Sequence, residues 1–566
     1  MTTLDALRPR TGGQILIDQL ILQGVKHVFC VPGESYLAAL DAMHDAPLNI
    51  TVCRQEGGAA MMAEAHGKLT GQPGICFVTR GPGATNASPG VHVASQDSTP
   101  MILFVGQVGR EMRGREAFQE LDYRAVFGSM AKWVAEIDCA ARFPELVSRA
   151  FHVASSGRPG PVVLSLPEDV LTEVATCADA APVTIAESSP RSTDLEQLER
   201  LLAQARRPVV IAGGSRWDAA ATAQLAEFVS QRDLPVCVSF RRQSLFPGSH
   251  PHYIGEAGAG ANPALVRAIR ESDLVLLLGT RFSEMASQGY TLLDIPRPRQ
   301  KLIHVHAGAE ELGRVYQPDL ALNVTPRAFL QATSESVPVP CEDRKGYLAT
   351  LRQNYLTWSD TATEVPGRFN LGKGLLALRG ILPAAVTLTT GAGNYATWVN
   401  RFFQFQALGK LLAPTSGSMG YGVPAAVGAL RLDPTRLVIA FAGDGCFLMN
   451  GQEFATAVQY RLPLIVVIAD NSGYGTIRMH QESQYPGRVV GTVLRNPDFA
   501  AYAVAFGGYG ERVERTEDFV PAFERALAAG KPAILHCIVD IEALTPTLSL
   551  SAIRDAALRR APSTRN

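Results

Sequence analysis

The sequence lacks the features that mark several large classes of protein. Its nine cysteines are scattered without a CxxC pair, so neither a zinc cluster nor a secreted disulfide framework is indicated. Its 52 basic and 53 acidic residues balance, and no long run of like charge suits a nucleic-acid backbone or an anionic membrane. No apolar run approaches the ~18 residues of a membrane span. We therefore expect neither nucleic acid nor a membrane among its partners.

A secretion signal is also missing. The opening residues, MTTLDALRPR, hold no apolar segment followed by a small-residue cleavage site, which predicts a cytoplasmic protein. The length of 566 residues is enough for several domains and more than one hydrophobic core.

What the sequence does contain is a repeated strand-and-helix pattern. Between residues 12 and 106, short runs rich in Val and Ile alternate with helix-like segments, and each run ends in a turn: HVFCV, ITVC, GICFVT and MILFVG. Strands that alternate with helices predict a parallel sheet covered on both faces. Ligands bind such sheets beyond the carboxyl ends of the strands, where these turns lie.

Two weakly patterned stretches divide the chain. One lies near residues 176–190 and the other near 335–368. We predict an α/β protein of three doubly wound parallel-sheet domains, at residues 1–185, 191–340 and 365–545. The last residues, 551–566, are predicted to form a short helix and a frayed end.

The most informative motif lies in the third block. Gly443-Asp444-Gly445 is followed, after 24 residues, by Asp470-Asn471 at the end of an apolar run. Alone, a DG pair indicates a turn and an Asn after a strand indicates a cap. Together they would place Asp444 and Asn471 on neighbouring strand ends as oxygen ligands for a hard cation such as Mg²⁺ that also holds a diphosphate. Gly445 lets the backbone approach a phosphate, and the following helix supplies free N–H groups.

This pattern resembles the signature of the thiamine diphosphate (ThDP) enzymes, a GDG followed at similar spacing by an Asn pair. Asp470 replaces the first Asn here. The resemblance spans nearly the whole chain and is nearest to acetolactate synthase large subunits and their pyruvate oxidase and decarboxylase relatives. The matching motifs are GPGATN (81–86), AFQE (117–120), GRPGPV (157–162), MGYGVPAAVGA (419–429) and NPDF (496–499). The three domains would then be pyrimidine-binding, central and diphosphate-binding.

The resemblance implies roles for individual residues. Glu56 would hydrogen-bond the cofactor's pyrimidine ring and favour its imino tautomer, which removes the thiazolium proton; the alternative is a glutamate in the first turn of a helix. Met419 would support the bent cofactor, and Gly417 would offer a backbone carbonyl. Asp444, Asn471 and the carbonyl of Gly473 would bind the metal. The remaining predicted cofactor contacts are Gly393, Asn394, Tyr395, Gly443, Gly445, Cys446, Tyr474, Gly475 and Thr476. Relatives have Gln-His at positions 394 and 395.

Near the family's substrate channel the match is partial. Phe118, Gln119 and Lys132 agree, and Gln119 is a candidate catalytic residue. Met285 replaces the arginine thought to hold the acceptor's carboxylate, which an apolar thioether cannot do. His480 replaces a tryptophan of the acceptor pocket and is either catalytic or a surface residue.

Two further departures stand close to the active-site turns. Arg80 replaces a serine and would either bind an anionic substrate or pair with a carboxylate such as Glu34. Glu34, in VPGESY, stands where acetolactate synthases have glycine and pyruvate decarboxylases have a catalytic aspartate. We predict proton transfer to or from the substrate for Glu34. The alternative is a carboxylate in the first turn of a helix at 36–44 that Ser35 caps.

The resemblance also bears on other ligands and on assembly. Bound FAD is an alternative for the central block, where Gly213-Gly214 and Arg281 match loosely. However, His306 and Gly308 replace the acidic pair expected to hold ribose hydroxyls. In relatives, the first and third blocks of different subunits enclose each cofactor. This implies a homodimer at the minimum and a homotetramer as the expected assembly.

The leading functional hypothesis is a ThDP- and Mg²⁺-dependent carboligase. It would decarboxylate a 2-oxo acid and transfer the acyl group to a carbonyl acceptor, as acetolactate synthase does. The rival is a lyase or decarboxylase of the benzaldehyde lyase, 2-hydroxyacyl-CoA lyase or phenylpyruvate decarboxylase type. A non-catalytic relative is disfavoured because Glu56, Asp444, Asn471 and Met419 are all present. A dehydrogenase is disfavoured because no strand is followed by GxGxxG.

Overall fold

The computed structural model describes residues 8–334 and 343–560, and the predicted frayed end at 561–566 lies outside them. Three six-stranded sheets are present, each parallel throughout. The chain divides into two compact units: one runs to Ala186 and includes Pro424–Pro434, and the other holds the remainder. The first unit contains one sheet and the second contains two. The prediction of three parallel-sheet α/β domains is confirmed.

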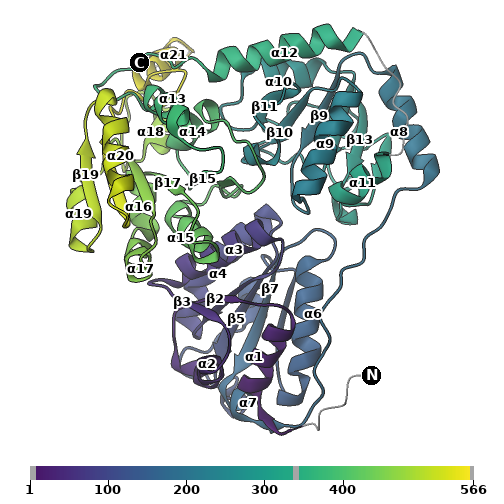
Figure 1. Cartoon of the computed structure of the whole chain (residues 1–566), viewed down its shortest axis with the longest axis vertical. Helices are drawn as coiled ribbons and strands as arrows, with labels where there is room; N and C mark the ends of the chain where they lie inside the picture. The colour runs from purple at the N-terminus through teal and green to yellow at the C-terminus, as the bar shows by residue number, and fades with distance from the viewer. Residues whose placement is uncertain (1–7, 335–342, 561–566) are drawn as a thin grey trace, which may run out of the picture. The chain divides into compact units, whose positions relative to one another are not determined.

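The first sheet has the strand order β3-β2-β4-β5-β7-β6. Its apolar runs are buried on both faces, as continuous Val- and Ile-rich strands should be. Helices α1, α2, α6 and α7 share one core with the sheet, while α3 and α4 pack against each other over β2, β4 and β5 (Figure 1). The strands are β2 (His27–Cys30), β3 (Asn49–Val52), β4 (Gly74–Val78), β5 (Met101–Gln107), β6 (Trp133–Glu136) and β7 (Pro161–Pro167).

Apart from the segment Pro424–Pro434, the helices of this unit lie in the connections of its sheet, and most begin within a few residues of the preceding strand. They are α1 (Gly12–Leu22), α2 (Leu37–His44), α3 (Glu56–Thr70), α4 (Gly81–Asp97), α5 (Tyr123–Phe127), α6 (Phe143–Ser155) and α7 (Glu168–Thr172), with a short antiparallel pair β1 (Arg10–Thr11) and β8 (Val174–Ala175). Ser35 does not cap α2 as the sequence suggested. It is buried in a 3₁₀ turn (Glu34–Tyr36), and its hydroxyl lies 2.9 Å from that of Thr79.

The central sheet has the order β11-β10-β9-β12-β13-β14. Its strands are β9 (Pro208–Ala212), β10 (Val236–Ser239), β11 (Tyr253–Ala257), β12 (Leu274–Leu278), β13 (Lys301–Val305) and β14 (Leu320–Leu322), and its helices are α8 (Ser192–Gln204), α9 (Ala219–Gln231), α10 (Pro263–Glu271), α11 (Pro326–Thr333) and α12 (Asp343–Ser359). Helix α12 occupies much of the stretch expected to be weakly patterned. It packs on β11 and α10 through Leu351 and Tyr355. Its buried residues Leu348, Leu351 and Tyr355 have helical spacing, so the expectation of a weakly patterned stretch missed a helix.

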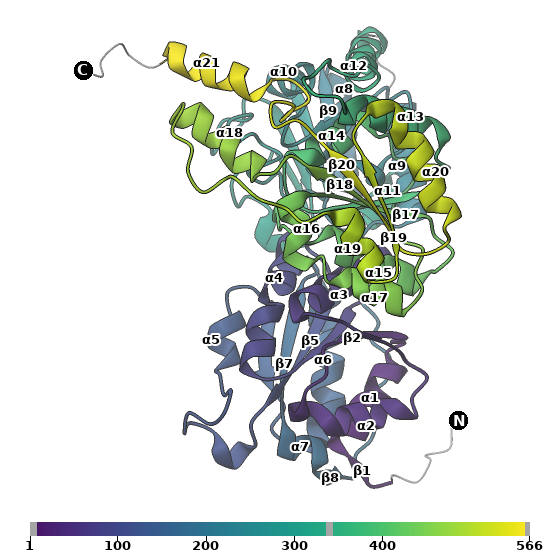
Figure 2. The same ribbon diagram turned by 90° about the vertical axis from the view of Figure 1, so that its left-hand side faces the viewer.

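The third sheet has the order β16-β15-β17-β18-β20-β19. Its strands are β15 (Thr387–Thr390), β16 (Leu411–Leu412), β17 (Val438–Gly443), β18 (Ile465–Asp470), β19 (Tyr509–Val513) and β20 (Ala533–Ile538). Helices α13 (Leu371–Ile381), α14 (Tyr395–Phe402) and α20 (Phe519–Ala528) share one core with the sheet. In Figure 2, α20 and α16 (Asp444–Asn450) lie on opposite sides of these strands.

The remaining helices of the third block lie in the connections between its strands or after the last strand. They are α15 (Gly422–Leu432), α17 (Glu453–Gln459), α18 (Gly475–Gln484), α19 (Phe499–Ala505) and α21 (Leu550–Arg560). Helix α21 confirms the helix predicted near the end of the chain. Within residues 8–334 and 343–560, no helix has both the length and the apolar composition that crossing a membrane requires.

Candidate active site

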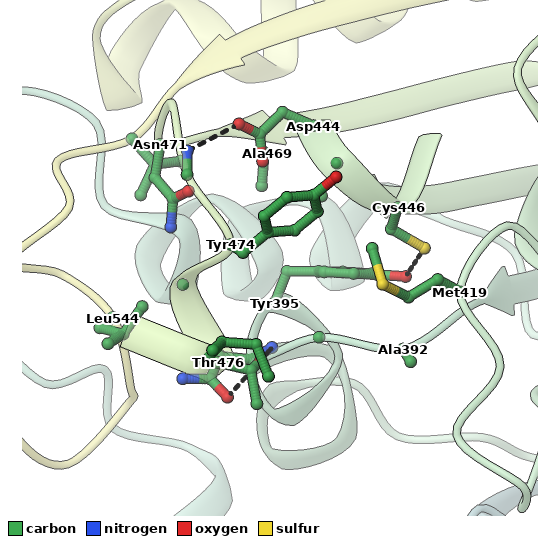
Figure 3. A pocket seen from close by; sticks show the side chains of 18 of the residues that line it. Ala392, Tyr395, Met419, Asp444, Cys446, Ala469, Asn471, Tyr474, Thr476 and Leu544 are labelled. Carbon is green, nitrogen blue, oxygen red and sulfur yellow. Dashed lines mark hydrogen bonds between the residues drawn. The ribbon is translucent and has the colours of Figure 1, made fainter. Parts of the chain in front are cut away.

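A cavity of about 250 Å³ opens at the carboxyl edge of the third sheet (Figure 3). It is lined by every residue that the sequence assigns to the metal or to the cofactor within this block, from Gly393 to Thr476 and including Met419. Leu371, Trp398 and Leu544 add apolar walls that the sequence motifs did not identify. The cavity therefore combines an apolar wall with a narrow polar end, the usual composition of a cofactor site.

Three helices begin at the polar end of this cavity, one of them α16, which starts at Asp444 itself. Helix α14 starts at Tyr395 after β15, and α18 starts at Gly475 after β18. Free N–H groups at such helix starts attract anions. Gly445 lets the ring of Tyr474 pack closely against the backbone, because a Cβ there would lie 2.7 Å from that ring. Gly417 has a φ of +68°, a conformation that favours glycine and directs its backbone into the cavity wall.

Asp444 and Asn471 present oxygen atoms at this end. Oδ2 of Asp444 accepts hydrogen bonds from the N–H of Gly473 at 3.0 Å and from Nδ2 of Asn496 at 2.7 Å. Oδ1 of Asn471 is buried without a hydrogen-bond partner. Burial raises the pKa of Asp444 to about 6, against the hydrogen bonds that it accepts. An unpaired buried oxygen and a desolvated carboxylate both gain from a bound cation.

The donor set fits a hard divalent metal. In the part of the chain that the structure describes, no three His, Cys, Asp or Glu side chains form a metal cluster. The predicted set instead offers one carboxylate, one side-chain amide oxygen and the backbone of Gly473, whose N–H is bonded to Asp444. Oxygen donors of mixed kind suit Mg²⁺, which usually shares its ligands with substrate or cofactor phosphates.

Asp470 does not line the cavity but supports its edge. Its Oδ1 accepts from the N–H of Ser472 and from Nδ2 of Asn496, both at 2.8 Å, and its Oδ2 lies 2.8 Å from Nε2 of His536. Burial alone would raise the pKa of Asp470, but these hydrogen bonds hold it below its ordinary value. No role was predicted for Asn496 or His536 from the sequence, where the one signal is that Asn496 opens the NPDF motif.

Asn394 and Tyr395 line the cavity and connect the elements around it. The Tyr395 hydroxyl accepts from the N–H of Gly391 at 2.8 Å and lies 3.3 Å from Sγ of Cys446. Asn394 exchanges two hydrogen bonds of 3.0 Å with the hydroxyl of Thr476, one through its backbone N–H and one through Oδ1. These contacts tie the starts of α14, α16 and α18 to one another.

The first unit gathers a second group of predicted residues. Glu34 and Arg80, which follow β2 and β4, form an ion pair with 3.0 Å between Oε1 and Nη2. The Arg80 side chain is only 9% exposed, whereas that of Glu34 is 62% exposed. The pairing interpretation of Arg80 is therefore confirmed, and the carboxylate it holds is open to solvent within this unit.

Glu56 begins α3 in the same unit. Its Oε2 accepts a hydrogen bond of 3.0 Å from Nδ2 of Asn86, in the GPGATN motif. A Cβ at Gly83 would lie 3.4 Å from Oε1 of Glu56, so the start of α4 leaves room beside the carboxylate. The alternative of a first-turn glutamate describes its position, and the Asn86 contact orients it.

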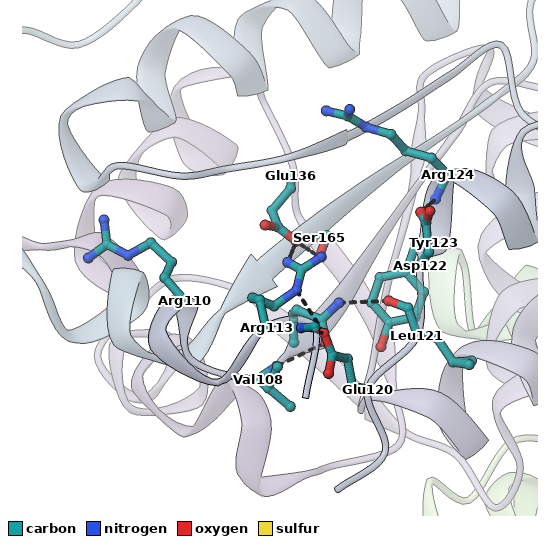
Figure 4. A network of polar contacts seen from close by, with 12 residues as sticks. Val108, Arg110, Arg113, Glu120, Leu121, Asp122, Tyr123, Arg124, Glu136 and Ser165 are labelled. Atoms are coloured by element: carbon teal, nitrogen blue, oxygen red, sulfur yellow. Dashed lines mark hydrogen bonds and ion pairs between the residues drawn. The ribbon is translucent and has the colours of Figure 1, made fainter. Parts of the chain in front are cut away.

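A polar network holds the loop that carries Gln119 (Figure 4). Glu120 accepts from the N–H groups of Gly114 and Ala117, and Arg113 bridges Glu120 to Glu136 on β6. This network fixes Gln119 in a left-handed conformation with a φ of +64°. The carbonyl of Gln119 in turn accepts from the N–H of Gly81, beside Arg80. Neighbouring Phe118 is 71% exposed, and the Arg80 guanidinium lies 5.9 Å from its ring centre.

Three other predicted positions lie elsewhere. His480 is exposed on α18 and is not among the residues that line the cavity. Nζ of Lys132 donates to the carbonyls of Val153 and Ser156 at the end of α6, a structural contact. Met285, in the central block, is 40% exposed.

The loops considered for FAD are closely packed against their own sheet. A Cβ at Gly214 would lie 1.8 Å from the carbonyl oxygen of Gly279, and one at Gly213 would lie 2.0 Å from the hydroxyl of Ser239. Nδ1 of His306 pairs with the backbone of Gly308. These glycines are thus explained by loop packing.

Comparison with known proteins identifies all three blocks. Residues 10–126 match the N-terminal TPP binding domain of thiamine pyrophosphate enzymes, residues 195–333 the central domain, and residues 391–537 the C-terminal TPP binding domain. The acetolactate synthase isozyme 2 large subunit of Escherichia coli is 31% identical over 532 residues, which are 94% of this chain and 95% of that protein.

Other relatives agree. A probable acetolactate synthase large subunit of Methanocaldococcus jannaschii is 29% identical over 94% of this chain and 92% of its own length. An acetolactate synthase of Mycobacterium bovis is 31% identical over 95% of this chain and 89% of its own. The chain therefore belongs to the thiamine pyrophosphate enzymes, in the family of the acetolactate synthase large subunits.

Proposed function

We propose that the protein is a Mg²⁺-dependent ThDP carboligase that takes a 2-oxo acid as donor and joins its acyl group to a carbonyl acceptor. The observation that carries this is the cavity at the third sheet. There Asp444 and the unpaired side-chain oxygen of Asn471 lie beside the starts of α14 and α18. Its oxygen donors fit a divalent cation, and its N–H groups fit a diphosphate.

We assign the residues of this cavity as follows. Asp444, Asn471 and the carbonyl of Gly473 would hold Mg²⁺. The backbone around Gly393, Gly445 and Gly475 would contact the diphosphate, and Met419 with Gly417 would hold the rest of the cofactor. The remaining contacts with the cofactor would come from Asn394, Tyr395, Gly443, Cys446, Tyr474 and Thr476. When bound, ThDP supplies a nucleophilic carbon that attacks the 2-oxo acid and stabilises the charge left by loss of CO₂.

The first unit would supply the side chains that hold and transfer protons. Glu56, oriented by Asn86, would hold a proton at the cofactor's pyrimidine. Beyond the ends of β2 and β4, Glu34, which pairs with Arg80, would transfer a proton to or from the substrate, and Gln119 would contact the substrate. His480, whose side chain is exposed on α18, would contact the acceptor.

The direct test uses purified full-length protein with pyruvate, ThDP and Mg²⁺. Acetolactate and CO₂ should form, and EDTA should stop both. If neither product forms while the protein still binds ThDP and Mg²⁺, pyruvate is not the substrate. If ThDP and Mg²⁺ do not bind, the assignment of the cavity is wrong.

A second candidate is a lyase or decarboxylase acting on another 2-oxo acid or on a 2-hydroxyacyl compound. The observation that favours it is the Glu34–Arg80 ion pair, at positions where acetolactate synthases resembling this chain have glycine and serine. A panel of both substrate classes, assayed for carbon–carbon bond cleavage without an acceptor, separates the candidates. Cleavage that needs no acceptor favours the lyase.

We also propose a cytoplasmic homotetramer with a homodimer as the minimum active unit, and domains at residues 1–185, 191–340 and 365–545. Light scattering of the active protein tests the assembly. FAD stays the alternative ligand of the central block, although packing within the central sheet already accounts for Gly213 and Gly214. An absorbance scan of the purified protein tests it: a flavin spectrum supports bound FAD, and its absence rules FAD out.

A further inference from the structure

Behind the predicted metal ligands lies a chain of polar side chains with no assigned role. Asn496 donates from one nitrogen, Nδ2, to Asp444 Oδ2 at 2.7 Å and to Asp470 Oδ1 at 2.8 Å. On the other side of Asp470, Nε2 of His536 lies 2.8 Å from Oδ2. The order is therefore Asp444, Asn496, Asp470 and His536, from the cavity wall inward.

The orientation of the Asn496 amide follows from its partners. Both are carboxylate oxygens, which only accept when ionised, so the nitrogen and not the oxygen must face them. Oδ1 of Asn496 accordingly points away and has no hydrogen-bond partner. Two carboxylates that share a site repel each other. One amide nitrogen between Asp444 and Asp470 relieves this repulsion and fixes their spacing.

The chemistry of position 470 matches this arrangement. An aspartate can accept from His536 with one oxygen and from Asn496 with the other, whereas an asparagine has a single acceptor oxygen. Asp470 is also the residue at which this chain departs from the Asn pair of the ThDP signature. Asp470, which replaces the first Asn of that signature, and His536 therefore form a matched acceptor and donor.

His536 is itself held firmly. It is buried on β20, and the ring of Phe499 packs edge-on against it with centroids 5.0 Å apart. Its Nδ1 has no hydrogen-bond partner, and Oδ1 of Asp498, which caps α19, lies 3.7 Å away. The segment Asn496–Phe499 thus supplies both the amide that joins the carboxylates and the ring that supports the histidine.

We propose that Asn496 and His536 are positioning residues of the metal and diphosphate site. Asn496 and the N–H of Gly473 both bind Oδ2 of Asp444, which sets the rotation of that carboxylate so that its other oxygen faces the cation. His536 fixes Asp470 at the end of β18 and so fixes the position of the adjacent Asn471, whose side-chain oxygen Oδ1 is a proposed metal ligand. This inference rests on the proposed Mg²⁺ site, and its measurable consequence is metal affinity.

The test uses full-length protein freed of metal, with saturating ThDP, and measures Mn²⁺ affinity from the free-ion signal in electron paramagnetic resonance. N496L keeps the approximate shape of Asn496 without its donor. H536F keeps a ring against Phe499 without a donor, and H536Q restores a donor. The matched control is N354L, at an exposed asparagine on α12.

We expect N496L and H536F to weaken Mn²⁺ binding about 10–100-fold, the usual effect of losing a partner of a metal ligand. H536Q should recover most of the affinity, N354L should bind like the unaltered protein, and saturating Mg²⁺ should restore turnover in N496L. Each titration is normalised to the folded fraction measured by circular dichroism. H536F compared with H536Q also separates a lost donor from a disturbed fold.

Two outcomes are distinguishable failures. If the unaltered protein shows no ThDP-dependent Mn²⁺ binding, the proposed metal site is wrong. If the unaltered protein binds Mn²⁺ and N496L or H536F binds it within about threefold of that affinity, well short of the usual effect, the positioning role is wrong and the metal site stands.

Discussion

The first and third sheets share one topology but carry different chemistry. In each, the strands lie in the order second, first, third, fourth, sixth and fifth along the chain. After the third strand, the first sheet presents Arg80 and the third sheet presents Asp444. After the second strand, they present Glu56 and the loop of Met419 respectively.

This comparison shows that the fold determines where side chains gather and the sequence determines what they do there. The carboxyl ends of parallel strands form the same edge in both sheets. In the third sheet that edge is lined by glycines and oxygen donors, which suits phosphate and metal. In the first sheet it holds a guanidinium with solvent-facing and helix-start carboxylates, which suits proton transfer and anionic substrates.

The largest predicted effect separates these two roles through Glu56. Glu56→Gln keeps the shape and the contact to Asn86 but removes the ionisable group. We expect turnover to fall by about 10²–10⁴-fold, the range of general acid–base catalysis, while ThDP-dependent Mn²⁺ affinity stays unchanged. Single-turnover kinetics and a metal titration measure the two quantities. Glu196→Gln, at an exposed glutamate of α8, is the control. Unchanged turnover in Glu56→Gln would contradict the assignment of acid–base catalysis to Glu56 in the first unit.

The complementary change is Asp444→Asn in the third sheet. Because it removes the single carboxylate of the proposed ligand set, metal affinity should fall by more than the about 10–100-fold typical of supporting residues. Turnover should fall with it and recover in part at high Mg²⁺. Asp294→Asn, an exposed aspartate, should behave like the unaltered protein. Tight metal binding by Asp444→Asn would contradict the assignment of metal binding to the third sheet.

A smaller effect is expected at Glu34. Glu34→Ala should lower kcat by about 10²-fold, the lower end of acid–base effects. It should change the free energy of unfolding by less than about 1 kcal/mol, since its pair with Arg80 is solvent-exposed on the carboxylate side. Steady-state kinetics and urea unfolding measure these, with Glu196→Ala as control. An intact kcat would leave Glu56 as the only acid–base residue in the first unit.

The smallest predicted effect concerns one buried and one partly buried histidine, which differ between the two sheets. His536 faces a carboxylate, whereas His66 of α3 packs 5.7 Å from the ring of His27 and its Nδ1 has no partner. Burial, reinforced by His27, lowers the pKa of His66 to about 4. The folded state therefore takes up fewer protons than the unfolded state below about pH 6.5.

The stabilisation associated with neutral His66 is fully present above the unfolded pKa near 6.5 and is lost as the pH falls toward 4. His66→Phe fills the same space without a proton site. It should reduce the loss of unfolding free energy between about pH 7 and pH 4.5 by roughly 2 kcal/mol. Urea unfolding at both pH values measures this, with exposed His152→Gln as control. An equal acid loss in His66→Phe and the unaltered protein would contradict it.

The sequence by itself determined the fold class, because continuous apolar runs such as those before Glu34 and Asp444 are long enough to specify buried parallel strands. It also determined the residues of the third-sheet cavity, since Gly, Asp and Asn at strand ends are informative locally. Polar or sparse segments were not predictable in this way. The strand β19 forms because β20, α19 and α20 pack against it, not because of its own pattern.

Only the tertiary structure decided which polar side chains meet. Asn496 and His536 lie 26 and 66 residues from Asp470, on separate segments, and nothing local marks them as its partners. The Glu34–Arg80 pair spans 46 residues and was one of two alternatives until the loops after β2 and β4 were seen side by side. Hydrogen bonds of this kind depend on distances of a few ångströms between distant segments, which residue order along the chain does not encode directly.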